Sequence, residues 1–142
     1  MNYKNLRISK LRDYLLDTLT TITNSIEQIN ADMLSNEIDN YSLDKIPTES
    51  VVTRWINGVE IHRDVFAFRS RKAYSIDTIN NLSNIGFFEQ FEKLIKSNNK
   101  KGVLPNIQGI QSIECLNCGT MVSADGETAI FDIQIQITYR EE

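Results

Sequence analysis

The C-terminal stretch Thr128–Arg140 has the clearest hydrophobic pattern in the chain. Its apolar residues fall on one parity and its polar residues on the other, which is typical of a half-buried β-strand. This alternation predicts an antiparallel sheet with one face on a core and the other in water. Upstream, Asp125-Gly126 suits a tight hairpin turn, so Ser112–Val122 is the predicted partner strand. The apolar positions are Phe131, Ile133, Ile135, Ile137 and Tyr139.

An N-terminal helix is predicted over Leu6–Ile29, where apolar residues recur every three or four positions. Ser9 is a candidate N-cap, and a helix start one turn earlier is the alternative. Threonines weaken the middle of this segment because β-branched residues are poor helix formers, so we expect the helix to end or loosen between Thr21 and Asn30. The weak centre favours packing on a sheet over a coiled coil.

A central helix pair is predicted after the middle of the chain. Ser75 caps the first helix, and Asn84-Ile85-Gly86 is expected to break or kink it. The second helix carries a phenylalanine-rich apolar stripe and late lysines, which favour the negative end of the helix dipole. Gly102 is the expected stop, and Pro105 and Gly109 mark the loop that follows.

A β-hairpin is predicted around Asn57-Gly58, which lies between Val51–Ile56 and Val59–Arg71. A two-residue Asn-Gly loop between β-branched runs is a strong hairpin signal. With Ile56 paired to Val59, neither face of the hairpin is cleanly apolar near its tip. In a monomer such a hairpin is an exposed ribbon, whereas in an assembly it is an arm that reaches a neighbour.

The apolar positions of the second hairpin strand change from one parity to the other along its length. Phe66 and Phe68 fall on the opposite parity from Val59 and Ile61. A β-bulge near Arg63–Val65 would bring both pairs to one face, so we expect one there.

These elements together predict an α+β fold in a single domain spanning residues 1–142. The expected architecture is a mostly antiparallel sheet of about four to five strands, with the N-terminal helix and the central helix pair packed on one face. Tyr41–Ile46 is the expected first strand, and Pro47 ends it or places it at a sheet edge. A chain of this length needs neither a disulfide nor a metal to fold.

The charge balance is mildly acidic, with 15 Lys+Arg against 19 Asp+Glu. This balance argues against nucleic acid as a primary ligand, because phosphate neutralisation needs a basic surface. Val51–Tyr74 is nevertheless basic, and the chain from Gly102 onward is acidic. Opposite patches on one subunit suit self-association, although a solvated surface is the default interpretation.

The sequence has no apolar run long enough for a membrane span and no signal-peptide core in MNYKNLRISK. We therefore expect the protein to be made and kept in the cytosol, or to leave it by a route other than secretion, with no membrane partner and with reduced cysteines.

The sequence offers few candidate catalytic or metal-binding residues. Cys115 and Cys118 have the spacing of a zinc or redox motif, but a zinc site needs four ligands and the only histidine is His62. A redox pair would start a helix, whereas these cysteines fall in a predicted strand that points them to opposite faces. Structural cysteines and a surface or packed histidine are favoured. We expect no enzyme activity, no cofactor and no metal.

From Tyr41 onward the sequence resembles a family of small phage proteins from Gram-positive hosts, labelled minor capsid or tail proteins, that act as tail terminators. The resemblance lies in the order and spacing of four stretches and not in any one motif. The first 40 residues match only as a helix. The stretches are VVTRWING (Val51–Gly58), FAFRSRKAYS (Phe66–Ser75), NIGFFEQFEKLIKSNNKKGVLP (Asn84–Pro105) and SIECLNCGTMVSADGETAIFDIQIQITYREE (Ser112–Glu142).

The resemblance implies a ring, usually of six subunits, that sits on the last ring of a tail tube and stops its growth. In a phage virion the ring provides the surface that the head connector meets, and in a contractile tail-like bacteriocin it closes the particle. The implied partners are other copies of the chain, the tube protein, the sheath in a contractile tail, and DNA only as it passes through the lumen. The residues expected at the subunit or tube interface are Arg54, Trp55, Ile56, Asn57, Gly58, Val59, Arg69 and Arg71.

Two other functions remain open at this point. A head–tail connector or tail-completion protein can share a small α+β fold, because fold does not decide function. A stand-alone small-molecule binding module or small enzyme predicts a deep pocket with converging polar groups and a stable monomer.

Overall fold

A computed structural model describes residues 5–21, 29–31, 40–73, 78–117, 119–124 and 128–141. The fold is α+β with a mostly antiparallel sheet, as the sequence predicts. None of the described helices is long and apolar enough to cross a membrane. The elements in chain order are α1 (Arg7–Leu19), β1 (Asn30–Ala31), β2 (Asn40–Ile46), β3 (Val51–Arg54), β4 (Glu60–Ala73), α2 (Thr78–Lys101), β5 (Ile110–Cys115), β6 (Thr120–Ala124) and β7 (Thr128–Glu141).

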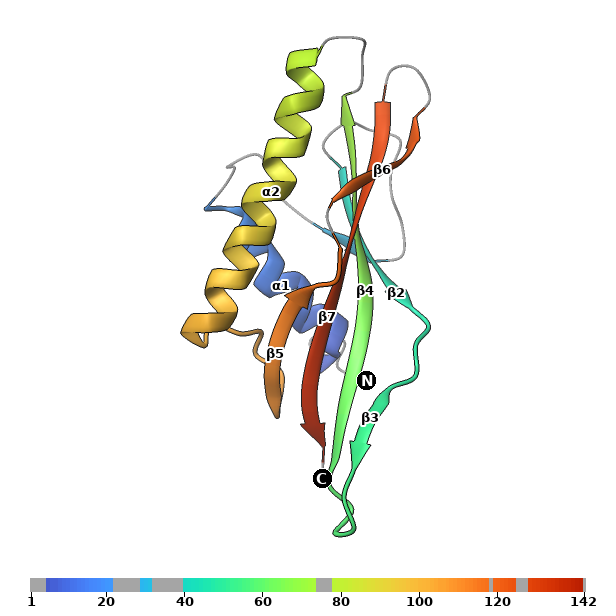
Figure 1. Cartoon of the computed structure of the whole chain (residues 1–142), viewed down its shortest axis with the longest axis vertical. Coiled ribbons are helices and arrows are strands. Elements are labelled where there is room, and N and C mark those ends of the chain that lie inside the picture. The colour runs from blue at the N-terminus through green and yellow to red at the C-terminus, as the bar shows by residue number, and fades with distance from the viewer. Residues whose placement is uncertain are drawn as a thin grey trace.

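The centre of the sheet is the antiparallel pair β4 and β7, which are 14 residues each. They stay in one register from Glu60 opposite Glu141 to Ala73 opposite Thr128. β2 and β3 pair with the other edge of β4, and β5 and β6 pair with the other edge of β7. Among the described strands, only β1 is parallel to its neighbour, β2. Both helices lie on the same side of this long, twisted sheet (Figure 1).

The described sheet has seven strands, so the predicted four to five was too few. The predicted partner strand Ser112–Val122 is two strands, β5 and β6, which pair with different parts of β7. The Asp125-Gly126 turn lies outside the described residues. β2 and its end before Pro47 confirm the predicted strand Tyr41–Ile46, but it is not the first strand, because β1 precedes it.

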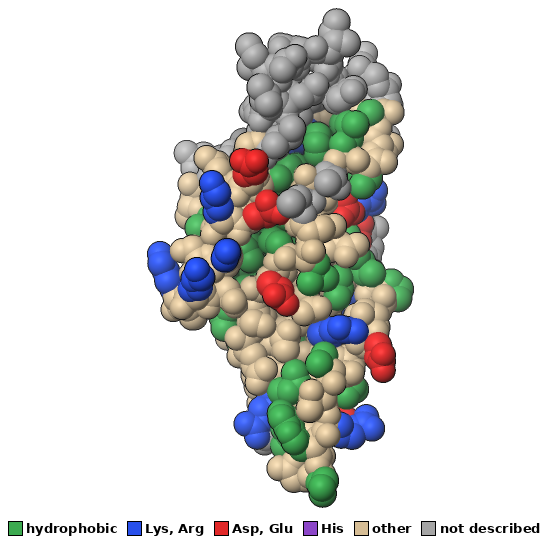
Figure 2. All heavy atoms as spheres, viewed as in Figure 1, with side chains coloured by type: hydrophobic (Ala, Val, Ile, Leu, Met, Phe, Trp, Pro, Cys, Tyr) green, Lys and Arg blue, Asp and Glu red, His purple; other side chains and the backbone are tan. Residues whose placement is uncertain are grey.

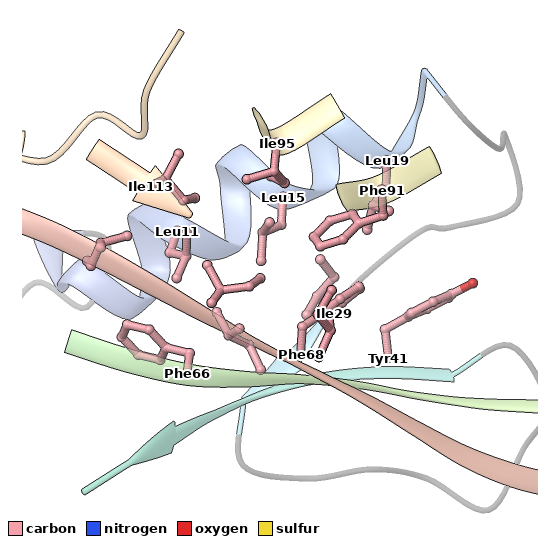
Figure 3. Close-up of a cluster of buried hydrophobic side chains, with 14 of the residues drawn as sticks. Leu11, Leu15, Leu19, Ile29, Tyr41, Phe66, Phe68, Phe91, Ile95 and Ile113 are labelled. Atoms are coloured by element: carbon pink, nitrogen blue, oxygen red, sulfur yellow. The ribbon is translucent and has the colours of Figure 1, made fainter. Parts of the chain in front are cut away.

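The hydrophobic core lies between the inner face of the sheet and the two helices. The alternation of β7 is confirmed, because all five apolar positions predicted to face inward are buried. Leu11, Leu15 and Leu19 of α1 and Phe91 and Ile95 of α2 point toward them (Figure 3). The core-facing residues of β4 and β2 include Phe66, Phe68, Leu43 and Tyr41, and Phe68 stacks on Tyr41 with ring centroids 5.8 Å apart.

α1 is shorter than predicted and begins without a side-chain cap. The N-cap position is Leu6, so Ser9 is not the cap and the helix begins about one turn earlier, as the alternative prediction has it. The helix ends at Leu19, just before the predicted window. There the hydroxyl groups of Thr20 and Thr21 donate to the carbonyl oxygens of Asp17 and Thr18, at 2.6 and 2.7 Å. Such local side-chain bonds are the reason that threonine weakens helices.

α2 is one helix, so the predicted helix pair and the break at Asn84-Ile85-Gly86 were wrong. A glycine inside a helix costs only about 1 kcal/mol relative to alanine. Burial of Phe88, Phe91 and Ile95 against the sheet outweighs that cost. The predicted stop is confirmed: Gly102 has φ +75°, and the N–H group of Val103 donates to the carbonyl oxygen of Asn98 at 2.9 Å. The predicted cap at Ser75 lies outside the described residues.

The hairpin is confirmed, but its loop is one residue longer than predicted. Trp55 and Val59 form the closing pair, because the Trp55 N–H group donates to the Val59 carbonyl oxygen at 2.9 Å. The predicted pairing of Ile56 with Val59 was therefore wrong. Gly58 has φ +88° and occupies the left-handed position of a three-residue loop.

No bulge occurs in β4 at Arg63–Val65, so that prediction was wrong. The register shift lies in β3 instead, between Val51 and Thr53. Because β4 stays regular, Phe66 and Phe68 face the core while Val59 and Ile61 lie on the opposite, outer face. Val59 and Ile61 are nevertheless buried, at 8% and 9% exposed.

Gly109→Ala is expected to destabilise the fold by about 2–5 kcal/mol, from left-handed backbone strain plus overpacking. Gly109 has φ +77°, and a Cβ atom there would lie 2.2 Å from the carbonyl oxygen of Arg140. Gly102→Ala is the matched control: its φ is +75° but nothing lies within 4 Å, so about 1–2 kcal/mol is expected. Urea denaturation of both variants checks this, and equal losses would contradict the close approach.

Candidate functional site: the hairpin tip and the polar cleft

The tip of the β3–β4 hairpin projects beyond the end of the sheet (Figure 1). The last pair of β4 with β7 is Glu60 opposite Glu141, so residues 55–59 lie past the end of β7. Ile56 is fully exposed, and Val52 and Trp55 are about half exposed. Hydrophobic side chains gather at this narrow end of the molecule (Figure 2). An apolar group of this kind on a projecting element is typical of a contact surface.

The tip is held in shape by its own polar contacts. The side-chain oxygen of Asn57 accepts the N–H group of Val59 at 3.2 Å, and Arg54 forms an ion pair with Glu60. This arginine, together with His62, lowers the pKa of Glu60. Trp55, Ile56, Asn57, Val59 and Arg140 line a shallow groove beside the tip. The hairpin therefore presents its exposed residues on an ordered frame.

Arg69 and Arg71 do not join the other predicted interface residues. They lie on β4 about 40 Å of extended strand away from the tip. Arg69 pairs with Asp44 at 3.2 Å, and Arg71 donates to the hydroxyl group of Thr128 at 3.0 Å. The structure thus brings six of the eight predicted residues together and leaves these two on a separate outer-face cluster.

His62 joins the root of the hairpin to the C-terminal end of β7. Its Nδ1 atom lies 2.9 Å from the Ser50 hydroxyl group, and its Nε2 atom lies 3.0 Å from Glu60 and 3.4 Å from Glu141. Its ring also stacks on Tyr139, with centroids 5.5 Å apart. This is the packed histidine that the sequence favours, and its contacts fix the angle of the hairpin.

A polar cleft lies on the other side of the same end of the molecule. It has a volume of about 880 Å³ and is built by the start of α1, the loop before β5 and the end of β7. At its wall, Arg7 donates to the buried carboxylate of Asp64 at 2.8 Å, and its guanidinium group lies 4.6 Å from the centre of the Tyr139 ring. The lining residues are Asn5, Arg7, Lys10, Asn106, Ile107, Gln108, Gly109, Tyr139, Arg140 and Glu141.

No local sequence pattern predicts this cleft, because its residues come from distant parts of the chain. One signal was available in β4. Asp64 has the same parity as Phe66 and Phe68, so a regular strand places its charge inward, where it is only 3% exposed. A buried carboxylate needs a cationic partner, and that partner is Arg7.

Cys115 lies at the end of β5 and has a poorly ionised thiol. Burial, together with the nearby carboxylates of Glu92 and Glu114, raises the pKa of this thiol to about 12. A redox-active thiol needs a lowered pKa, so this position is unsuited to that chemistry. Cys118 lies outside the described residues, and the prediction that the two thiols face opposite ways stays a prediction. Among the described residues, no group of three or more His, Cys, Asp or Glu could hold a metal ion.

In a Cys118→Ser variant, Cys115 is expected to react with iodoacetamide at least about 100-fold more slowly in the folded than in the unfolded protein. At about pH 8, a pKa of about 12 leaves about one thiol in 10⁴ as the reactive thiolate. Mass spectrometry of the alkylated protein, with and without urea, measures both rates. Equal rates in the folded and unfolded protein would mean that Cys115 is not buried and that the pKa of its thiol is not raised.

No protein-family model and no curated protein matches this sequence. The hairpin tip and the polar cleft are the two surface features of the described residues that bear on function.

Proposed function

We propose that this protein is a structural subunit of a ring, most simply a hexamer, that caps the tail tube of a phage or of a contractile tail-like bacteriocin. The observation that carries the proposal is the projecting hairpin, whose Ile56 side chain is fully exposed beyond the end of the sheet. A second copy of the chain, or the last ring of the tube, would cover it. The ring ends tube polymerisation and provides the head-proximal surface of the tail.

The physical basis is the cost of leaving apolar side chains in water. Val52, Trp55 and Ile56 are exposed on the β3–β4 hairpin, whose tip lies past the last pair of β4 with β7 at Glu60. Burying each such side chain in an interface stabilises it by about 1.5–3 kcal/mol. The hairpin is one side of a head-to-tail contact, which closes into a ring when the rotation between copies allows.

The other partners follow from the proposed position at the tube end. One face of the ring contacts the tube protein and, in a contractile tail, the sheath. The opposite face meets a head connector where a capsid is present. DNA passes through the lumen without being held, which suits a chain with a net charge of −4.

Addition of the purified protein to growing tubes of the cognate tube protein tests the proposal. The expected result is shorter tubes that carry an extra ring at one end in electron micrographs. Tubes of unchanged length, with the protein absent from their ends, would overturn it. A ring found at a portal instead of at a tube end would favour a head–tail connector.

The polar cleft favours a second candidate, a small-molecule binding module. Its volume of about 880 Å³ falls within the range of ligand pockets. A stable monomer that binds a metabolite in this cleft, and never joins a tail, would favour this candidate over the ring.

A further inference from the structure

We propose that the polar cleft binds a carboxylate-rich segment of a partner polypeptide. This inference goes beyond the ring and does not depend on it, because the cleft is complete within one chain. It rests on the cations that line the cleft, on how they are held, and on the polar groups beside them.

Arg7 is a preorganised donor at the cleft wall. Its Nε atom donates to Asp64, and the ring of Tyr139 supports the guanidinium plane. Among the described residues, the two terminal amino groups of Arg7 have no hydrogen-bond partner. A guanidinium group fixed in this way can form charge-assisted bonds with a carboxylate at little entropic cost.

Lys10 lies three residues after Arg7 on α1, so both side chains lie on the same side of the helix. It is half-buried and has no ion pair or hydrogen bond within the described part of the chain. Glu141 is the one acidic side chain in the lining, and it lies 3.4 Å from His62. Arg140 is the third cation in the lining, so three cations stand against Glu141 and the buried Asp64, which gives the site a net charge of +1 (3 − 2) on a protein whose net charge is −4.

The remaining lining favours a polypeptide over a nucleic acid. Asn5, Asn106 and Gln108 carry side-chain amides that can pair with the peptide groups of a bound segment. Lys10 and the terminal amino groups of Arg7 match one or two acidic side chains, whereas a nucleic acid strand needs a longer basic track. A short Asp- or Glu-rich segment satisfies both the cations and the amides.

Calorimetric titration of the full-length protein with acetyl-tetraglutamate-amide tests the proposal. Saturable binding is expected at low salt, and acetyl-tetraglutamine-amide is expected not to bind. Lys10→Glu is expected to weaken binding at least about tenfold, because it reverses a charge in the cleft. The matched control Lys96→Glu changes the same net charge on an exposed lysine of α2 outside the cleft, and a change within about twofold is expected.

Lys10→Gln distinguishes a loss of binding from a folding defect, because it removes the charge without adding a new one. This variant is expected to weaken binding by about threefold or more. Thermal melting of each variant checks that the fold is kept. The absence of saturable binding to the native protein, or equal losses for Lys10→Glu and Lys96→Glu, would overturn the proposal. Displacement of the peptide by millimolar inorganic phosphate, or tighter Lys10-dependent binding of a single-stranded oligonucleotide, would also overturn it.

Discussion

Ile135→Asp is expected to unfold the protein. Ile135 is fully buried on the inner face of β7, opposite Phe66 of β4 and Cys115 of β5. The substitution removes a core side chain and leaves an unpaired carboxylate in an apolar site. Together these effects are expected to cost more than about 5 kcal/mol, which is close to the total stability of many small domains.

The measurement is thermal melting followed by circular dichroism and size-exclusion chromatography. Thr138→Asp is the matched control, because residue 138 of the same strand lies on the outer face opposite Arg63. That variant should keep a melting temperature within a few degrees of the native protein, since it places the same charge beside a cation. A soluble Ile135→Asp protein that melts cooperatively would mean that the assignment of faces in β7 is wrong.

Replacement of both Trp55 and Ile56 by serine is expected to abolish ring formation and leave a folded monomer. Both side chains lie on the exposed tip, so the free energy of unfolding of the subunit should change by less than about 1 kcal/mol. The proposed contact with a neighbouring copy would lose two apolar anchors of the kind that dominate interface energies. Light scattering coupled to size-exclusion chromatography measures the mass of the assembly.

Val103→Ser provides the control for surface hydrophobicity. Val103 is an exposed apolar residue just after α2 and lies outside the hairpin. Its substitution should leave the mass of the assembly unchanged. Assembly of the Trp55 and Ile56 variant at native mass would refute the hairpin as the contact arm.

The parts of the fold that the sequence predicts best are those set by local periodicity. The alternation of β7 and the glycine stop at Gly102 depend on nearby residues, and both are confirmed. The helix break at Gly86 was wrong because its cost is smaller than the stabilisation from packing on the sheet. The bulge in β4 was wrong because the prediction assumed that Val59 faces the same core as Phe66.

The same distinction, between features set by nearby residues and features set by distant ones, applies to the candidate site. The hairpin tip could be predicted because Asn57-Gly58 marks a local turn. The cleft could not, because it forms only where the loop at Gly109 meets Arg140 and where α1 brings Arg7 to Asp64. Those contacts join residues far apart in the sequence, and no local pattern encodes their distance.

Native mass spectrometry of the purified full-length protein over a range of concentrations tests the ring most directly. The proposed ring predicts a closed assembly of identical subunits, most simply six, that persists on dilution. Replacement of Trp55 and Ile56 should dissociate this assembly into folded single chains. A protein that remains a single chain at the highest concentration reached would contradict it.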